Sequence, residues 1–139
     1  MSTSAKPLSN RALYKRASLC DLTVAAILIL FGGVYESFSF GVFSFYMIYA
    51  FAPFFLLGMG ELILSFFARF AYDRPGLYFF RWAACAGTAG SVVRGIVEIF
   101  GTLSELTAIF PVLFYAFLLI GILRVFYRIF IKKEEKQPL

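Results

Sequence analysis

Four long apolar runs, separated by short polar segments, dominate the pattern of hydrophobic and polar positions along the chain. The uncharged stretches are residues 22–35, 37–60, 82–93 and 106–123. A helix needs about 20 mostly apolar residues to cross the hydrocarbon core of a bilayer. The expected spans are residues 19–38, 44–68, 76–101 and 106–127. The pattern therefore predicts an all-α polytopic integral membrane protein, built as a four-transmembrane-helix bundle.

Glycine, proline and polar residues mark where these helices are expected to begin and end. The clearest break is the turn at 73–76, where Pro75 suits the first helical turn because its missing N–H needs no helical partner there. Gly101 is expected to end the same helix, and Ser104 is a candidate N-cap for the next one. Pro53 lies inside the second run, where the loss of a backbone donor predicts a kink.

The basic residues are sorted by side. With the N-terminus placed inside, all but one of the 13 Lys and Arg residues fall on the inner side of the expected spans. The two opposite loops carry only the acids Glu36 and Glu105. Because Lys and Arg are retained on the inner side of membranes, this asymmetry predicts that both termini lie inside. Arg94, within the third span, is the exception.

The segments outside the spans are short and charged. Residues 1–18 are basic, and no acid precedes Asp21. This composition is typical of a mitochondrial transit peptide. The alternative is an interfacial helix that begins near Ser9, with its apolar residues toward lipid. Those apolar residues are Leu13, Tyr14, Ala17 and Leu19. The expected organisation is thus the basic segment 1–18, a transmembrane domain over 19–130 and a charged tail over 131–139.

Composition excludes several functional classes. The chain has 139 residues, of which 61% are hydrophobic, whereas soluble domains have about 45–50%. The net charge of +5 comes from residues that flank the spans, which favours anionic lipid such as cardiolipin as a partner and argues against nucleic acid. The absence of histidine disfavours haem and most zinc or copper sites. No nucleotide loop or nucleophile–base set is present, so we expect neither catalytic residues, a metal nor a cofactor.

Charged residues within the spans are the candidate site residues. Glu61 and Arg81 should lie at similar depth on neighbouring helices, which predicts an interhelical ion pair. Arg94 and Glu98 are four residues apart and can meet on one helix face, and Glu36 approaches the same outer layer. Because an ionisable group inside a bilayer is costly, it usually pairs with another group or serves an ion pathway. We expect structural pairing, with a proton or ion route through Glu61 as the alternative.

Small residues recur every four positions along the third span, at Ala83, Gly87, Ser91 and Gly95. In lipid, small residues at this spacing let helix backbones approach closely. The third helix is therefore expected to be the central packed helix. Gly58 and Gly60 on the second helix are its expected packing partners.

Within the third span, Arg94-Gly95 is followed by residues 96–100 and then by Gly101-Thr102-Leu103. This stretch resembles the COPI-associated protein family. The family also has a glycine-rich first span and a second span that ends near a glutamate, which is Glu61 here. Val93 stands where the family has a glycine. The resemblance covers residues 22–125 in architecture, and it implies a small four-span protein of Golgi and vesicle membranes without known enzymatic activity. The topology is similar to that of MARVEL-type four-span proteins too.

Three functional hypotheses follow. The first is a non-catalytic structural or accessory subunit of a larger membrane complex, with other membrane-protein subunits as partners. The N-terminal composition favours a respiratory or ATP synthase assembly of the mitochondrial inner membrane. The second is a Golgi or vesicle trafficking protein, as the family resemblance implies. The third is a small ion or proton transporter that uses Glu61.

Overall fold

Every element of regular structure in the described part of the chain is helical. The structure is a computed structural model that describes residues 9–38, 43–67, 74–101 and 105–134. Ser104 and Asp73, at the predicted cap and turn, lie outside these ranges. The elements in chain order are α1 (Asn10–Phe38), α2 (Phe45–Ile48), the 3-10 turn η1 (Tyr49–Phe51), α3 (Ala52–Phe66), α4 (Arg74–Phe100), the 3-10 turn η2 (Glu105–Ala108) and α5 (Ile109–Glu134). The all-α prediction is confirmed.

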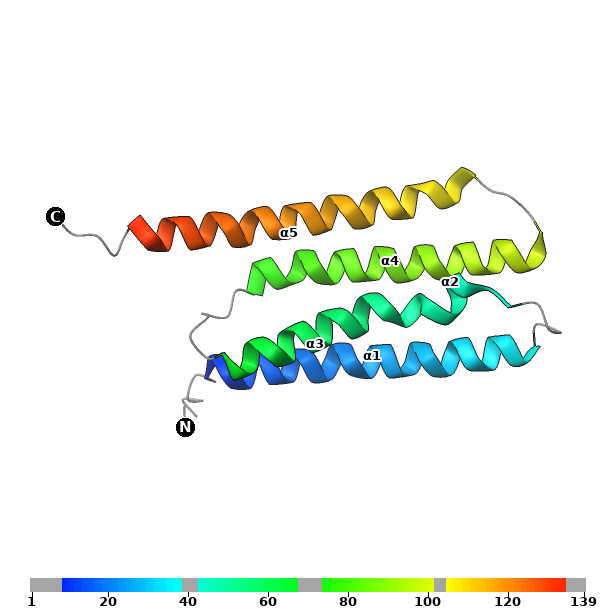
Figure 1. The fold of residues 1–139 in the computed structure, drawn as a ribbon, viewed down its shortest axis with the longest axis horizontal. Coiled ribbons are helices and arrows are strands. Elements are labelled where there is room, and N and C mark those ends of the chain that lie inside the picture. The colour runs from blue at the N-terminus through cyan, green and yellow to red at the C-terminus, as the bar shows by residue number, and fades with distance from the viewer. Residues whose placement is uncertain (1–8, 39–42, 68–73, 102–104, 135–139) are drawn as a thin grey trace, which may run out of the picture.

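Four helical segments are long and apolar enough to cross a membrane, as the sequence predicts. They are Asn10–Phe38, Phe45–Phe66, Pro75–Phe100 and Ile109–Ile131. Each spanning segment runs antiparallel to the one before it in the chain. The first residues of α1 and the last residues of α5 therefore lie at the same end of the bundle (Figure 1). We call this end the terminal end and the other the opposite end.

The bundle consists of two antiparallel hairpins. The first pairs α1 with α3, the second pairs α4 with α5, and α4 joins the two by packing against α2, η1 and α3 (Figure 1). Of the long helices that the structure describes, only α4 packs closely against α5. The third span is therefore the central helix of the arrangement, and α5 lies on one flank.

The first helix is longer than expected. It begins at Asn10 and continues without a break to Phe38, so residues 10–18 are its first turns and not a separate interfacial helix. Its 29 residues make a helix of about 43 Å, which exceeds a hydrocarbon core of about 30 Å. Tyr14 and Ala17, expected toward lipid, are buried at 5% and 7% exposure. At the other terminus, α5 extends to Glu134, so the tail predicted from 131 onward begins within a helix.

The second span is interrupted where its proline lies. The turn η1 separates α2 from α3, and Pro53 is in the first turn of α3. Proline has no N–H to donate to the preceding turn, so the helix cannot continue regularly through this point. Thr88 of α4 donates a hydrogen bond of 3.0 Å to the carbonyl of Ala50 within η1, and this satisfies a backbone group at the break. The sequence predicts a kink at Pro53, and the structure has a 3-10 turn directly before the helix turn that contains this proline.

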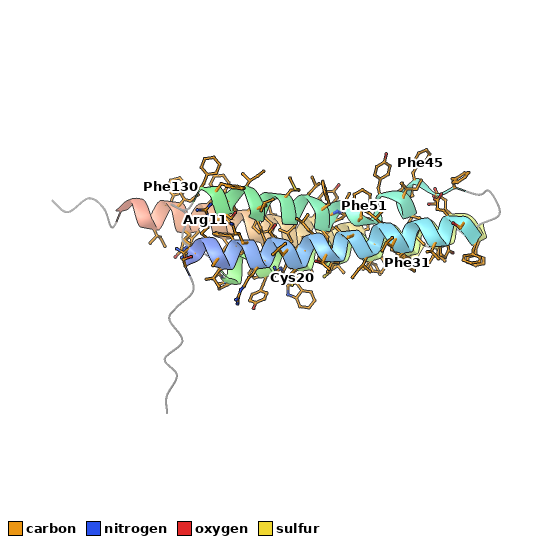
Figure 2. The ribbon with its side chains drawn as sticks, turned by 90° about the horizontal axis from the view of Figure 1, so that it is seen from below. Arg11, Cys20, Phe31, Phe45, Phe51 and Phe130 are labelled. Atoms are coloured by element: carbon orange, nitrogen blue, oxygen red, sulfur yellow. The ribbon has the colours of Figure 1, made fainter. Side chains whose placement is uncertain are left out.

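The packed interior is small and is built around small residues. Ala25 of α1, Phe54 of α3 and Ala84 of α4 form the buried core cluster. Most large apolar side chains point outward instead, and Figure 2 shows Phe45 and Phe130 on the outside of the bundle. An outward apolar surface is what lipid, or another transmembrane helix, requires of a membrane span.

Candidate functional site

A cluster of three charged residues joins α1, α3 and α4 in the terminal half of the bundle. Nε and Nη2 of Arg81 each lie 3.2 Å from Oδ2 of Asp21. Nη2 of Arg81 also lies 3.7 Å from Oε1 of Glu61, within ion-pair distance. The side chains of Asp21 and Glu61 are 6% and 1% exposed, and that of Arg81 is 30% exposed. One guanidinium thus serves two buried carboxylates.

The sequence places both acids on packed helix faces. On α1 the buried residues recur at helical spacing, at Tyr14, Ala17, Ser18, Asp21, Ala25 and Gly32. On α3 they are Phe54, Gly58, Glu61 and Ser65. A period of three to four residues keeps such positions on one face of a helix. Each acid is therefore surrounded by the helices packed against it and not by lipid.

Hydrogen bonds to backbone carbonyls support the cluster. The hydroxyl of Ser18 donates to the carbonyl of Gly58 at 2.8 Å, across the α1–α3 interface. Nη2 of Arg81 lies 3.4 Å from the carbonyl of Ala17, one turn before Asp21 on α1. In a membrane interior such bonds hold polar groups that would otherwise lack a partner. The cluster is therefore built as part of the helix packing.

The structure brings the predicted partners Glu61 and Arg81 together, but it gives the shorter contacts to Asp21. Sequence reasoning missed Asp21 because the first span was expected to begin near residue 19, which put this acid at the membrane boundary. Its spacing from Ser18 and Ala25, on the same helix face, was the signal that could have identified it. With α1 beginning at Asn10, Asp21 lies well within the helix.

A shallow groove lies beside this cluster on the surface formed by α1 and α4. Its volume is about 300 Å³. It combines the cationic side chains of Arg16 and Arg81 with a tyrosine and apolar residues. The lining residues are Leu13, Arg16, Ala17, Cys20, Leu77, Tyr78 and Arg81. A groove with cationic and apolar walls at the same level can hold the headgroup of an anionic lipid.

The charged residues near the opposite end do not pair as predicted. Within the described chain, Arg94 and Glu98 form no ion pair with each other. Instead, the guanidinium of Arg94 lies 4.3 Å from the centre of the Tyr46 ring, a cation–π contact. Oε2 of Glu98 accepts a hydrogen bond of 2.7 Å from the hydroxyl of Ser44, and Ser44 is 1% exposed. Ser44, directly before α2, and Tyr46, within α2, are these partners, and sequence spacing within α4 could not have identified them.

The remaining predicted site residues have separate surroundings. Glu36 is half-buried near the end of α1. Ala83 is buried at 2% exposure. A Cβ at Gly87 would lie 2.9 Å from the Phe114 ring on α5, and one at Gly95 would lie 3.1 Å from Cβ of Met47 on α2. These glycines therefore allow close helix approach, as the small-residue pattern predicts.

The expected glycine partners on the second span behave differently. A Cβ at Gly58 would lie 2.9 Å from Cγ of Leu22, so Gly58 packs against α1 and not against α4. Gly60 faces open space, with no atom within 4 Å of a Cβ placed there. The predicted contact of these two glycines with the third helix is wrong, because the first hairpin buries the face of α3 that carries Gly58.

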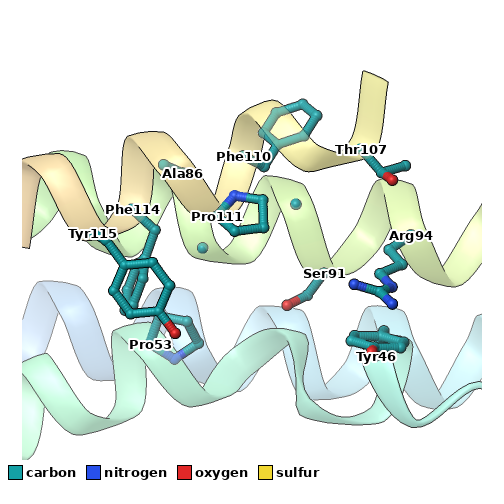
Figure 3. A pocket seen from close by; sticks show the side chains of 12 residues that line it. Tyr46, Pro53, Ala86, Ser91, Arg94, Thr107, Phe110, Pro111, Phe114 and Tyr115 are labelled. Atoms are coloured by element: carbon teal, nitrogen blue, oxygen red, sulfur yellow. The ribbon is translucent and has the colours of Figure 1, made fainter. Parts of the chain in front are cut away.

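Ser91, the remaining member of the small-residue pattern, lines a cavity of about 210 Å³ between the two hairpins (Figure 3). Arg94 lies at the same cavity, one turn further along α4. The walls are otherwise mostly aromatic rings, prolines and small residues. The other lining residues are Tyr46, Pro53, Ala86, Gly87, Gly90, Thr107, Phe110, Pro111, Phe114 and Tyr115. The cavity is thus polar at Arg94 and Ser91 and apolar elsewhere along α4.

The described residues contain no group of three His, Cys, Asp or Glu side chains that could hold a metal ion. Cys20 and Cys85 are both free and exposed. Comparison with known proteins found no matching family model, no similar curated protein and no similar solved structure. The resemblance to the COPI-associated family therefore stays a prediction.

Proposed function

We propose that this protein is a non-catalytic integral membrane subunit that acts by packing against other subunits of a larger membrane assembly. The cluster of Asp21, Glu61 and Arg81 carries the proposal. In this cluster, charged residues from three helices inside the expected spans pair with one another. Such mutual pairing is typical of residues that stabilise helix packing. Glu61 and Asp21 are turned into the bundle, with side chains only 1% and 6% exposed.

The flank formed by α5 is the surface that a partner would cover. This helix packs along α4, and its outward side carries large exposed apolar residues. They include Val112, Leu119, Leu123, Phe126 and Phe130. We propose that a transmembrane helix of another subunit occupies this side, because helix association in lipid depends on such van der Waals surfaces.

Photo-crosslinking in the native membrane tests this proposal. A photoreactive phenylalanine analogue replaces Leu119 on the outward side of α5, and a matched control replaces Leu30 on the outward side of α1. These leucines are 57% and 69% exposed. We expect a discrete protein adduct at position 119 and lipid adducts at position 30. If both positions give only lipid adducts, and the tagged chain elutes alone in mild detergent, the accessory-subunit proposal is refuted.

The organelle is a separate part of the proposal. The basic N-terminal composition supports the mitochondrial inner membrane and an assembly of the respiratory or ATP synthase type. The resemblance around Arg94-Gly95 supports the Golgi membrane instead. Imaging of a tagged copy against markers of both organelles decides between them.

We also propose that an anionic lipid such as cardiolipin occupies the groove between α1 and α4. Its support is the pairing of Arg16 with apolar walls at the terminal end. Arg16→Gln should lower the amount of cardiolipin that copurifies with the protein. Arg11→Gln is the matched control, since Arg11 is an exposed arginine of the same helix that does not line the groove. Equal lipid loss in the two variants would argue for a diffuse charge effect.

Transport through Glu61 is the second candidate, and one observation favours it. Neither carboxylate oxygen of Glu61 is hydrogen-bonded to a described residue, and two carboxylates share one guanidinium. A bound proton or cation would balance that charge. Glu61→Gln should then abolish flux into proteoliposomes while the amount of assembled protein stays constant. Loss of assembly without any measurable flux in the parent protein would support the structural role.

A further inference from the structure

The cavity between α4, α5 and the α2–α3 segment contains Arg94, which has no acidic partner among the residues that the structure describes. Arg94 and Ser91 are three residues apart on α4, so both side chains leave the same face of the helix and point toward the α2–α3 side (Figure 3). Within the described chain, neither the Arg94 guanidinium nor the Ser91 hydroxyl forms a hydrogen bond. Arg94 rests on the Tyr46 ring, which contacts one face of the guanidinium and leaves its N–H groups available.

This arrangement calls for an anion. An arginine inside a transmembrane span is costly unless an oppositely charged or hydrogen-bonding group meets it. Glu98, the nearest acid on the same helix, is already engaged by Ser44 at 2.7 Å. The guanidinium carries five N–H donors in a planar fork that matches carboxylate and phosphate oxygens. Because Arg94 is exposed at the cavity, an oxyanion from outside the described chain can reach these N–H groups.

The cavity extends along α4, and its two ends differ in depth and in polarity. Arg94 lies six residues from the end of α4, which is about 9 Å from the opposite end of the bundle. Ala86, at the far end of the lining, is eight residues deeper, or about 12 Å. Around Ala86 the walls are mostly apolar and include Pro53 and Phe114, and the Tyr115 hydroxyl beside Pro53 is a polar atom there (Figure 3). The cavity thus has a charged end at Arg94 and a mostly apolar end near Ala86. This shape suits an amphiphile with its headgroup at Arg94 and its alkyl chain toward the middle of the span.

The volume limits the size of the tail. About 210 Å³ is below the roughly 300–1,000 Å³ of a site that encloses a drug-sized ligand. It suits a segment of one hydrocarbon chain and not a two-chain lipid as a whole. Gly90 shows that the walls are tightly set, because a Cβ there would lie 2.5 Å from Cβ of Phe110.

We propose that this cavity binds one alkyl chain of an anionic amphiphile, with its carboxylate or phosphate on Arg94 and its chain along α4 toward Ala86. Ser91 adds a hydroxyl that can donate to the same oxyanion. The proposal is independent of the accessory-subunit function, because it concerns a ligand within one copy of the chain. It applies equally to a free fatty acid and to a membrane lipid, since both present an oxyanion on an alkyl chain.

Direct binding of four probes tests the proposal. The full-length protein in nonionic detergent is titrated with dodecanoate, dodecyl phosphate, dodecanol and inorganic phosphate, and native mass spectrometry counts the bound molecules. We expect both anionic amphiphiles to bind at least tenfold more tightly than dodecanol and inorganic phosphate. Preference for dodecanoate would identify a fatty acid as the source, and preference for dodecyl phosphate a phospholipid. Equal binding of dodecanol, or of inorganic phosphate, overturns the proposal.

Variants locate the site. Arg94→Gln should weaken binding of both anionic amphiphiles about tenfold or more, because it removes charge-assisted hydrogen bonds. The affinity of Arg94→Lys should lie between those of the parent protein and Arg94→Gln. Ala86→Leu fills the apolar end and should weaken dodecyl phosphate binding. Cys85→Leu is its matched control, since the neighbouring Cys85 is exposed and does not line the cavity. If Arg94→Gln does not fold, Arg94→Lys and Ala86→Leu decide the matter. Unchanged binding in the folded variants refutes the site.

Discussion

Arg81 holds Asp21 through two hydrogen bonds, with its Nε and its Nη2 each 3.2 Å from the same carboxylate oxygen. The two residues lie 60 positions apart, on α1 and α4. The backbones of these helices are not close neighbours in the bundle, so the long arginine side chain makes the connection. Glu61 of α3 completes the cluster at 3.7 Å. This contact ties the first hairpin to the second.

Arg81→Gln should be the most damaging single change in the cluster. It leaves the carboxylates of Asp21 and Glu61 buried without a cation, and such loss costs about 3–5 kcal/mol. Arg81→Lys keeps the charge but not the fork and should cost less. Thermal unfolding in detergent measures both variants. Equal stability of Arg81→Gln and the parent protein would show that the cluster does not stabilise the fold.

Asp21→Asn should destabilise the protein more than Glu61→Gln. Asp21 accepts two hydrogen bonds of 3.2 Å from Arg81, whereas the contact between Glu61 and Arg81 is longer, at 3.7 Å. A hydrogen bond to a charged group contributes about 1.5–3 kcal/mol. Side-by-side unfolding of the two variants is the measurement. The reverse order of stability would identify Glu61 as the main partner of Arg81.

Gly58 and Gly60 provide a matched pair on α3. Gly58→Ala places a Cβ 2.9 Å from Cγ of Leu22 and should cost about 1–3 kcal/mol through overpacking of the α1–α3 interface. Gly60→Ala meets no atom within 4 Å and should be neutral or stabilising by about 0.5–1 kcal/mol, because alanine favours a helix. Unfolding midpoints compare the two, and similar losses in both would contradict the observed packing.

The hydrogen bond between Ser44 and Glu98 should contribute to the docking of α2 on α4. The bond is 2.7 Å long, and Ser44 is almost fully buried. A double-mutant cycle with Ser44→Ala and Glu98→Ala should give a coupling energy of about 1.5–3 kcal/mol, because the acceptor is a carboxylate. Glu98→Gln retains an acceptor and should lose less. Strict additivity of the two alanine changes would mean that the side chains do not interact.

The sidedness of the chain can be tested at the two ends of α1. In a variant lacking Cys20 and Cys85, single cysteines replace Ser9 or Ser37, which are both exposed. In sealed vesicles of known orientation, an impermeant thiol reagent should label position 9 from the inner side and position 37 from the outer side, because basic residues stay inside. Labelling of both positions from one side would refute a first span through the membrane.

Much of the architecture follows from one-dimensional patterns. The length of each apolar run specifies a spanning helix, because the bilayer requires backbone groups to be satisfied within the segment. The break at Pro53 and the end of α4 before Gly101 follow from local backbone chemistry, and Gly101 adopts a φ of 70° there. These features depend on residues near each other in the chain, which is why the sequence sufficed.

Which side chains meet was decided by the tertiary structure. Helix depth suggested that Glu61 and Arg81 could be partners, but rotation of each helix about its axis determines which face meets which neighbour. That rotation places Asp21 against Arg81 and turns Gly58 toward Leu22. It also brings Ser44 and Tyr46 of the second span to Glu98 and Arg94. The sequence by itself determined the spans and their charge sorting, whereas packing between helices decided the partners, because those contacts join residues far apart in the chain.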